Sequence, residues 1–283
     1  ESIEATRMLK DAGFKVCAHM MPNLLGSTPD LDRKSMKEVF ENPSYRPDEI
    51  KIYPMVVTDK SELTEMWKRW EFEAYDDQTL IELMVDLHSM IPHYCRLNRM
   101  YRDIPAEQIL HGSHLANLRQ ITENLMRERW ITPVDTCSRE VKGKHNDPSN
   151  AQLVVREYEA SDGYEYMLSF EDPEDETLFA LLRLRIPSQY FTGEEHFLPV
   201  LKNAAIVREI HTYGEQLPIG TTGDEYSSQH RGFGKQLVSE AERIVSEKYS
   251  SIKKIAVIAG VGVRAYFEKL GYECEDEYMT RNI

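Results

Sequence analysis

The segment whose residue types and spacing most clearly suggest chemistry is Gln229–Gly234, which reads Gln-His-Arg-Gly-Phe-Gly. When a loop of this type leads into a helix, several backbone N–H groups point toward one position, which also lies at the positive end of the helix dipole. Glycines at 232 and 234 let the backbone approach a ligand closely, because they carry no Cβ. The segment is therefore predicted to bind an anion such as a pyrophosphate, although plain turns also contain such glycine pairs.

The elements that would position this loop are predicted on both sides of it. Residues 204–213 have the composition of a strand. Residues 232–249 are predicted to form a helix, because apolar side chains recur on one face. A short apolar strand is predicted over 254–259, and a glycine loop and a short helix that contains Tyr266 follow it.

Three further strands are predicted before this region, over 152–159, 164–170 and 177–186. Polar and glycine residues at 162–163 and 172–175 supply the turns between them. Residues 150–283 would then form one compact domain of ordinary size. Its core is predicted to contain Val154, Tyr158, Leu182 and Leu184.

The order strand, glycine loop, helix, strand and short aromatic helix resembles that of the GNAT-type acetyltransferases. The resemblance implies that the glycine loop binds acetyl-CoA and that the thioester lies along residues 209–212. It also implies that Tyr266 lies near the sulfur as a general acid to the departing thiolate, the alternative being a packed aromatic side chain. His211 is the second catalytic candidate, as a general base or a substrate-positioning residue. The residues assigned in this way to acetyl-CoA are Glu209, Ile210, His211, Thr212, Gln229, Arg231, Gly232, Phe233, Gly234, Lys235 and Tyr266.

Composition and charge limit the class of protein. The chain has 283 residues, of which 41% are hydrophobic, and no apolar run approaches the length of a membrane span. Its formal net charge of −14 argues against indiscriminate binding to nucleic acid, although a local cleft on an acidic protein can be basic. The four cysteines show no disulfide-scaffold or C-x-x-C spacing. A reducing, cytoplasmic location is therefore expected.

The first 60 residues are predicted to alternate between helix and strand. Helices are predicted over 2–12 and 32–41, and strands over 14–21 and 50–57. Consecutive helix–strand units imply parallel strands joined by right-handed crossovers. Two strands do not make a stable parallel sheet, which is normally buried on both faces. Because the chain also begins at Glu1 and not at Met, further units are expected to precede it.

Over its whole length the chain resembles the family of the catalytic subunit of Elongator, the tRNA wobble-uridine modifying enzyme. The resemblance implies a radical S-adenosylmethionine (SAM) barrel fused to an acetyltransferase domain. In that family an iron–sulfur cluster cleaves SAM, and the radical activates the acetyl group of acetyl-CoA to form a carboxymethyl group on C5 of uridine 34. The matching segments are 18–22, 42–48, 51–54, 99–105, 138–141, 169–173, 181–185, 208–214, 229–234 and 264–272.

The sequence departs from this family in ways that limit what the resemblance implies. The three closely spaced cysteines that hold the 4Fe-4S cluster are absent, so SAM and the cluster are implied only for a longer protein. Phe267 stands where many members have a second tyrosine, so Tyr266 alone would supply the hydroxyl. The expected fold is α/β, with three parts: the closing part of a radical SAM (partial TIM-type) barrel over 1–60, a helical linker over 61–149, and a GNAT-type acetyltransferase domain over 150–283.

The linker is expected to be mostly helical and to contain the tRNA contacts. Arg96, Arg99 and Arg102 recur every third residue, so they would share one face of a helix but alternate sides on a strand. They are candidates for contacts with tRNA phosphates, the alternative being salt bridges to an acidic neighbouring domain. The cysteines and histidines of the linker complete no zinc motif, so no metal site is predicted, and a zinc ion at the domain junction stays an alternative.

The predicted function is that of an acetyl-CoA-dependent enzyme that forms a 5-carboxymethyl-type modification at uridine 34 of tRNA. The anticodon loop of tRNA is the expected partner, with other Elongator-type subunits and a second copy of the chain as candidate protein partners and no membrane. The first alternative is a protein lysine N-acetyltransferase, in which Glu209 or His211 deprotonates an amine. The second alternative is a non-catalytic scaffold that recruits other subunits through its acidic surface.

Overall fold

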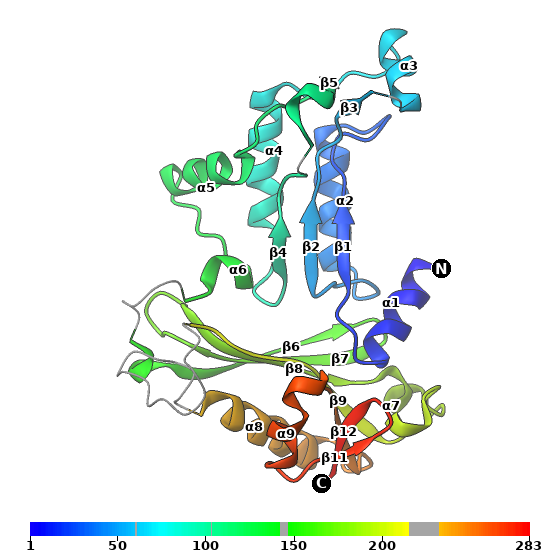
Figure 1. Ribbon diagram of the computed structural model, residues 1–283, viewed down its shortest axis with the longest axis vertical. Helices are drawn as coiled ribbons and strands as arrows, with labels where there is room; N and C mark the ends of the chain where they lie inside the picture. The colour runs from blue at the N-terminus through cyan, green and yellow to red at the C-terminus, as the bar shows by residue number, and fades with distance from the viewer. Residues whose placement is uncertain (60, 103, 142–146, 215–231) are drawn as a thin grey trace. The chain divides into compact units, whose positions relative to one another are not determined.

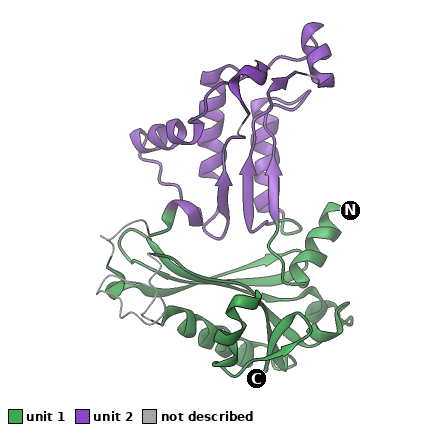
Figure 2. Ribbon diagram, in the orientation of Figure 1, with its two compact units in different colours: residues 1–16, 43–45, 139–283 green, residues 17–42, 46–138 purple. Residues whose placement is uncertain are grey.

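The computed structural model describes residues 1–59, 61–102, 104–141, 147–214 and 232–283 (Figure 1). The chain forms two compact units, each made from separate stretches of sequence (Figure 2). Unit 1 contains residues 1–16, 43–45 and 139–283, and unit 2 contains residues 17–42 and 46–138. None of the helices within the described ranges is both long and apolar enough to cross a membrane.

Unit 2 is built on a parallel sheet of three strands in the order β1–β2–β4. Thr28 caps α2 by accepting a hydrogen bond from the N–H of Leu31, and Asp76 caps α4 in the same way through Thr79. The apolar residues of α4 recur on one face and are buried, so packing as well as capping stabilises this helix. The main elements are β1 (Cys17–Met20), α2 (Pro29–Glu41), β2 (Glu49–Ile52), α4 (Asp77–Ser89) and β4 (Arg96–Arg99). The smaller ones are β3 (Val57–Thr58), α3 (Glu62–Lys68), η1 (Ala106–Gln108), β5 (Ile109–His111), α5 (Leu118–Glu128) and α6 (Thr136–Arg139).

A buried pair formed by His88 and Asp135 joins α4 to the end of unit 2. His88 Nε2 lies 3.0 Å from Asp135 Oδ2, and both side chains are fully buried. The other carboxylate oxygen of Asp135 accepts a hydrogen bond of 3.3 Å from the N–H of Leu97 in β4. Burial favours the neutral acid, but His88 and the Ser138 hydroxyl favour the carboxylate, and together they lower the pKa of Asp135 below its ordinary value. The carboxylate thus fastens α4, β4 and the start of α6 to one another.

Unit 1 contains a sheet of seven strands in the order β11–β12–β10–β9–β8–β7–β6. All neighbours pair antiparallel except β9 and β10, which run parallel. The strands are β6 (Gln152–Ala160), β7 (Gly163–Glu171), β8 (Leu178–Ile186), β9 (Ala204–Thr212), β10 (Lys254–Ile258), β11 (Glu273–Glu275) and β12 (Tyr278–Asn282). The helices are α1 (Ser2–Asp11), η2 (Pro148–Asn150), α7 (Ser188–Thr192), η3 (Pro199–Leu201), α8 (Phe233–Lys248), η5 (Val261–Val263) and α9 (Arg264–Glu268).

The two faces of the seven-stranded sheet have opposite character. Helix α8 covers one face (Figure 1), where its residues Leu237, Val238 and Ala241 form a single apolar core with the sheet. Leu182 and Leu184 of β8 belong to that core, whereas Arg183 and Arg185 lie between and beyond them on the other face. Successive side chains of a strand point to opposite faces, so the alternation of leucine and arginine in β8 sets up this division.

The structure confirms most of the predicted elements and corrects several expectations. The parallel pairing of β1 with β2, the strands over 152–213 and the helix over 232–249 are present as expected. The expectation of a mostly helical segment over 61–149 is wrong, because β4 joins the parallel sheet and β5 pairs with β3. Val154 and Tyr158 are half-buried instead of core residues, because β6 is an edge strand.

The boundaries of the two units also differ from the predicted boundaries at residues 60 and 149. Helix α1 was expected to belong to a barrel remnant over 1–60, but it belongs to unit 1 with the C-terminal part of the chain. The reason is the side chain of Asp11 at its end, which is fully buried and forms an ion pair with Arg185 of β8. A carboxylate buried in this way needs its cationic partner and therefore holds α1 against that sheet.

Candidate functional site

Strands β9 and β10 separate from each other halfway along β9. Their parallel pairing runs from Ala204↔Lys254 to Val207↔Val257, but β9 continues to Thr212 beside β8. At the point of separation the register of β8 and β9 shifts, since Arg183 faces Glu209 and Leu184 faces Val207. Arg208 is therefore the extra residue of a β-bulge, which bends a strand and ends its regular pairing. Beyond it, the edge of β9 from 208 to 212 has no strand partner on the β10 side among the described residues.

The glycine-led start of α8 lies beside this open edge. Gly232 has a left-handed φ of 72° and is exposed, and no described residue lies within 4 Å of a Cβ placed on it. A methyl group placed on Gly234 would lie 3.1 Å from the hydroxyl oxygen of Tyr266 and 3.8 Å from Cδ1 of Ile210. Helix α8, strand β9 and helix α9 thus meet at Gly234, so the structure brings together four of the predicted site residues: Gly232, Gly234, Ile210 and Tyr266.

Tyr266 has the surroundings of a proton donor. Its side chain is 39% exposed, and its ring packs edge-on against the buried Phe267 with ring centroids 5.2 Å apart. Partial burial raises the pKa of the phenol above its ordinary value, because the phenolate is less well solvated there. The hydroxyl is therefore protonated at neutral pH and can donate a hydrogen bond or a proton toward the open edge of β9.

The carboxylate of Glu209 forms ion pairs with two cations. Its carboxylate lies 2.8 Å from Nε of Arg183 and 3.0 Å from Nζ of Lys15. Burial alone would raise the pKa of this carboxyl, but the two cations lower it below the ordinary value. A carboxylate held in this way is a weak base, so the geometry does not favour Glu209 as the group that deprotonates an amine.

The remaining predicted residues have varied surroundings. The side chain of Phe233 is buried and stacks on Phe170 with ring centroids 4.4 Å apart, so only its backbone can face a ligand. Lys235 and His211 are exposed, and the imidazole of His211 packs against Tyr213 at 4.3 Å between ring centroids. Gln229 and Arg231 lie outside the described residues.

The three predicted tRNA-contacting arginines lie in unit 2. Arg96 and Arg99 are the first and last residues of β4, and Arg102 follows in an irregular segment. Of the two arrangements that the spacing allows, Arg96 and Arg99 therefore adopt the strand. Arg99 and Arg102 are exposed, whereas Arg96 is half-buried.

Sequence reasoning missed the charged residues behind the site. Lys15, Arg183 and Arg208 all contact or flank the open edge of β9. The signal was present in β8, where arginines alternate with leucines in a strand that is buried on both faces. Arginine is rarely buried unless it is paired, so this pattern indicates partners on neighbouring elements.

Candidate metal ligands do not cluster within the described parts of the chain. No group of three or more His, Cys, Asp or Glu side chains there could hold a metal ion. Cys17 and Cys137 are half-buried, Cys95 is buried and Cys274 is exposed, and all four are free cysteines.

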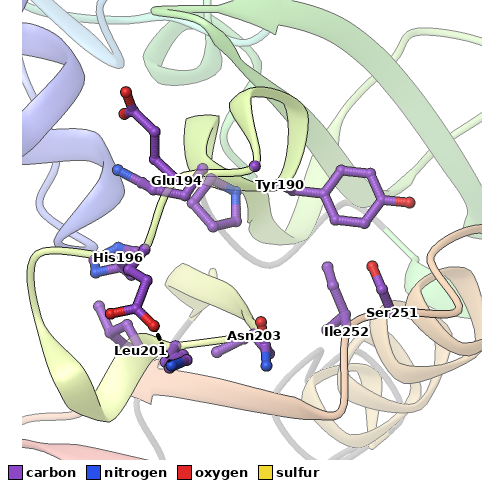
Figure 3. Close-up of a pocket in the computed structure, with 13 residues that line it drawn as sticks. Tyr190, Glu194, His196, Leu201, Asn203, Ser251 and Ile252 are labelled. Carbon is purple, nitrogen blue, oxygen red and sulfur yellow. Dashed lines mark hydrogen bonds and ion pairs between the residues drawn. The ribbon is translucent and has the colours of Figure 1, made fainter.

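A cavity of about 340 Å³ lies in unit 1 near the first residues of β9 and β10, away from their separated ends (Figure 3). Its wall includes Tyr190, Leu201 and Ile252, together with His196. Burial lowers the pKa of His196, whose Nδ1 accepts a hydrogen bond of 3.0 Å from the N–H of Leu198. None of the predicted site residues lines this cavity, so it is separate from the candidate site.

These features define a class of protein. A helix that begins at a glycine loop, beside two parallel strands that separate, is the arrangement of a GNAT-type acetyltransferase. In unit 2, residues 47–128 match the model of the Radical_SAM C-terminal domain. The chain thus joins an acetyltransferase fold to a part of a radical SAM protein.

Relatives match over the whole chain. The tRNA uridine(34) acetyltransferase of Methanocaldococcus jannaschii is 41% identical, with 100% of this chain and 52% of the relative covered. Elongator complex protein 3 of Saccharomyces cerevisiae is 39% identical, with 99% and 50% covered. The solved structure of archaeal Methanocaldococcus infernus Elp3 with an N-terminal deletion (1-46) has a TM-score of 0.89 and 39% identity, and the match covers 100% of this chain and 66% of that one. The chain spans about half the length of the curated relatives it matches. It belongs to the family of Elongator complex protein 3 and the tRNA uridine(34) acetyltransferases.

Proposed function

We propose that this chain supplies the acetyl-CoA-binding and acyl-transfer part of an enzyme that forms a 5-carboxymethyl-type modification on uridine 34 of tRNA. The names of its relatives, tRNA uridine(34) acetyltransferase and Elongator complex protein 3, support the choice of tRNA as acceptor. Support for acetyl-CoA comes from the site itself.

The observation that carries the proposal is the separation of β9 from β10 beside the start of α8. Over residues 208–212, the edge of β9 that faces away from β8 pairs with no described strand, and we assign the backbone N–H and C=O groups on that edge to the amides of a pantetheine arm, much as an exposed strand pairs with a peptide. The start of α8 offers backbone N–H groups and a helix dipole to the diphosphate. The exposed Lys235 in the first turn adds a positive charge. These donors and acceptors fit the chemistry of coenzyme A.

Tyr266 is the residue we assign to the leaving group. Acetyl-CoA supplies an activated acetyl thioester, and its departing thiolate needs a proton. The Tyr266 hydroxyl is protonated at neutral pH and lies near Gly234 and Ile210, between the helix start and the open strand edge. His211, exposed on β9, is assigned a substrate-positioning role.

The residues of this chain do not fit an iron–sulfur cluster. Such clusters are held by several cysteine thiolates, and the four cysteines here form no such group in the described structure. The proposal therefore assigns the chemistry of the cluster and of SAM to no residue of this chain.

Partners and location follow from the proposed substrate. Arg96, Arg99 and Arg102 of unit 2 are assigned to tRNA phosphates, because arginine pairs readily with phosphate oxygens. We place the enzyme in the cytoplasm and assign other Elongator-type subunits, or a second copy of the chain, as its protein partners.

The test compares acceptors in one assay. Binding of acetyl-CoA is measured by calorimetry, and release of free CoA thiol is followed with tRNA, with a lysine-rich peptide, and with neither. We expect binding, and thiol release that tRNA stimulates and the peptide does not. Acetylation of the peptide would favour a lysine acetyltransferase, and failure to bind acetyl-CoA would refute both enzymes.

A further inference from the structure

Residues 11–15, at the end of α1, contact the sheet of unit 1 at the point where β9 and β10 separate. The hydroxyl of Tyr278 on β12 donates a hydrogen bond of 2.8 Å to the carbonyl oxygen of Ala12. A methyl group placed on Gly13 would lie 3.3 Å from Ile206 of β9 and 3.5 Å from Ile258 of β10. This segment therefore rests directly on the last paired part of the two strands.

The next two residues bind β9 just beyond the separation. The carbonyl oxygen of Phe14 accepts a hydrogen bond of 2.8 Å from Nη1 of Arg208, the bulge residue. The ammonium of Lys15 forms an ion pair of 3.0 Å with Glu209. Segment 11–15 thus contacts β9 on both sides of the bulge.

Arg208 also belongs to a buried cluster of four charges that begins in α1. Its Nη2 lies 2.8 Å from Glu165 of β7, and the other oxygen of Glu165 lies 2.9 Å from Arg185. Arg185 in turn lies 2.7 Å from Asp11. None of the four residues is more than 4% exposed, and a fifth, partly exposed residue, Arg7, lies 3.2 Å from the second carboxylate oxygen of Asp11. Every member of such a cluster needs its partners, because an unpaired buried charge is strongly destabilising.

The charge cluster explains why β9 has its bulge at Arg208. If β9 continued in register with β10, Arg208 would pair with Ile258, the last residue of β10. The bulge instead directs its guanidinium to Glu165 and to the carbonyl oxygen of Phe14. The open edge of β9 therefore begins at the residue whose side chain binds the charge cluster and whose backbone no longer pairs with β10.

We propose that Arg208 is a positioning residue that sets where β9 separates from β10, and that segment 11–15 of the chain is the support that holds it there. The inference rests on the proposed acetyl-CoA site, because the open edge of β9 is where the pantetheine arm would bind. Arg208 itself contacts no substrate in this scheme and acts only through the path of β9.

The test uses two arginine variants of the full chain. Arg208→Met removes the guanidinium but leaves Glu165 paired with Arg185. The matched control is Arg156→Met on β6, whose guanidinium binds Glu171 at 2.6 and 2.8 Å and leaves it paired with Arg139 at 3.0 Å. Both variants should unfold at a lower temperature. Only Arg208→Met should weaken acetyl-CoA binding, by about tenfold for each backbone hydrogen bond lost, while Arg156→Met stays at the wild-type affinity.

Two further variants separate position from stability. Glu165→Gln combined with Arg208→Met removes one buried charge of each sign and leaves Arg185 paired with Asp11, so the melting temperature should recover whereas the affinity for acetyl-CoA should not. Arg208→Lys keeps the charge and should restore much of the affinity. A folded Arg208→Met variant with wild-type affinity would overturn the inference, as would a double variant that recovers both properties. If Arg208→Met alone does not fold, the double variant decides.

A readout without ligand keeps the two proposals apart. Amide hydrogen exchange of residues 208–212 should change about tenfold or more in Arg208→Met and stay constant in Arg156→Met, because only the first alters the path of β9. Equal exchange in the two variants would refute the positioning role. If the wild-type chain fails to bind acetyl-CoA, the proposed function fails, and hydrogen exchange still decides whether Arg208 sets the strand path.

Discussion

Gly232 allows the anion site to be tested separately from the stability of the helix it starts. Its φ of 72° lies in the left-handed region, and no described residue lies within 4 Å of a Cβ placed there. Gly232→Ala therefore clashes with no described residue, and we expect its cost to be conformational, about 1–2 kcal/mol. Gly232→Asn should cost less, since asparagine adopts this conformation more readily than other side chains do.

Gly232→Ala should be the less stable of the two variants, and Gly232→Asn should be the weaker binder of acetyl-CoA. In thermal unfolding followed by circular dichroism, Gly232→Ala should lower the melting temperature by about 2–8 °C, and Gly232→Asn by less. In calorimetry with acetyl-CoA, the order should reverse, with Gly232→Asn losing about tenfold or more, because its larger side chain fills the space that the diphosphate would occupy.

Gly193 provides the control, because it also has a left-handed φ, of 75°, meets no described residue within 4 Å of an added Cβ, and lies in unit 1. Gly193→Ala and Gly193→Asn should reproduce the stability changes and leave acetyl-CoA binding intact. A Gly232→Asn variant that binds acetyl-CoA as tightly as the wild type would refute the diphosphate site. Equal melting temperatures for Gly232→Ala and the wild type would refute the conformational argument.

Three further predictions concern other parts of the chain. Tyr266→Phe should slow thiol release by about a hundredfold with little change in acetyl-CoA affinity, and an unchanged rate would remove the general-acid role. Phe233→Ala should lower the free energy of unfolding by about 3–5 kcal/mol, because its ring is stacked in the core, and denaturant titration measures this loss. The pKa of Asp135 is below its ordinary value, so its stabilisation is present at neutral pH and lost as pH falls through and below 3.8. Asp135→Asn should cost about 1.5–3 kcal/mol at pH 7, because it weakens hydrogen bonds to a charged group, and should flatten the acid side of the stability curve, whereas a parallel curve would contradict the linkage.

Elements with a regular hydrophobic pattern were predictable from sequence. The strands from β6 to β9 and helix α8 have local sequence patterns, namely alternating apolar residues, turn residues and one apolar helix face. The secondary structure that these patterns predict is the one that forms. The contact of Gly234 with Tyr266 could be anticipated because both lie in elements whose order resembles a known fold.

Features that depend on distant partners could not be predicted. The arginine spacing of β4 suits a helix or a strand equally, and pairing with β2 decides between them. Phe233 was assigned to the cofactor because it lies in the glycine loop. Its side chain instead stacks on Phe170 in the core. No local sequence pattern connects these two residues. The ion pair between Glu209 and Lys15 likewise connects residues that are 194 positions apart in the sequence.

The alternation of the chain between the two units has a consequence for synthesis. Asp11 is paired with a residue 174 positions later, and Ala12 with one 266 positions later. During synthesis on the ribosome, α1 therefore cannot form these contacts until nearly all of this chain has emerged, and it stays exposed to water until then. Unit 2 comprises residues 17–42 and 46–138, all of which emerge before strands β6 to β12 of that sheet. It also follows that no single cut of the chain yields both units whole, since a cleavage that frees unit 2 takes α1 away from the sheet that it supports.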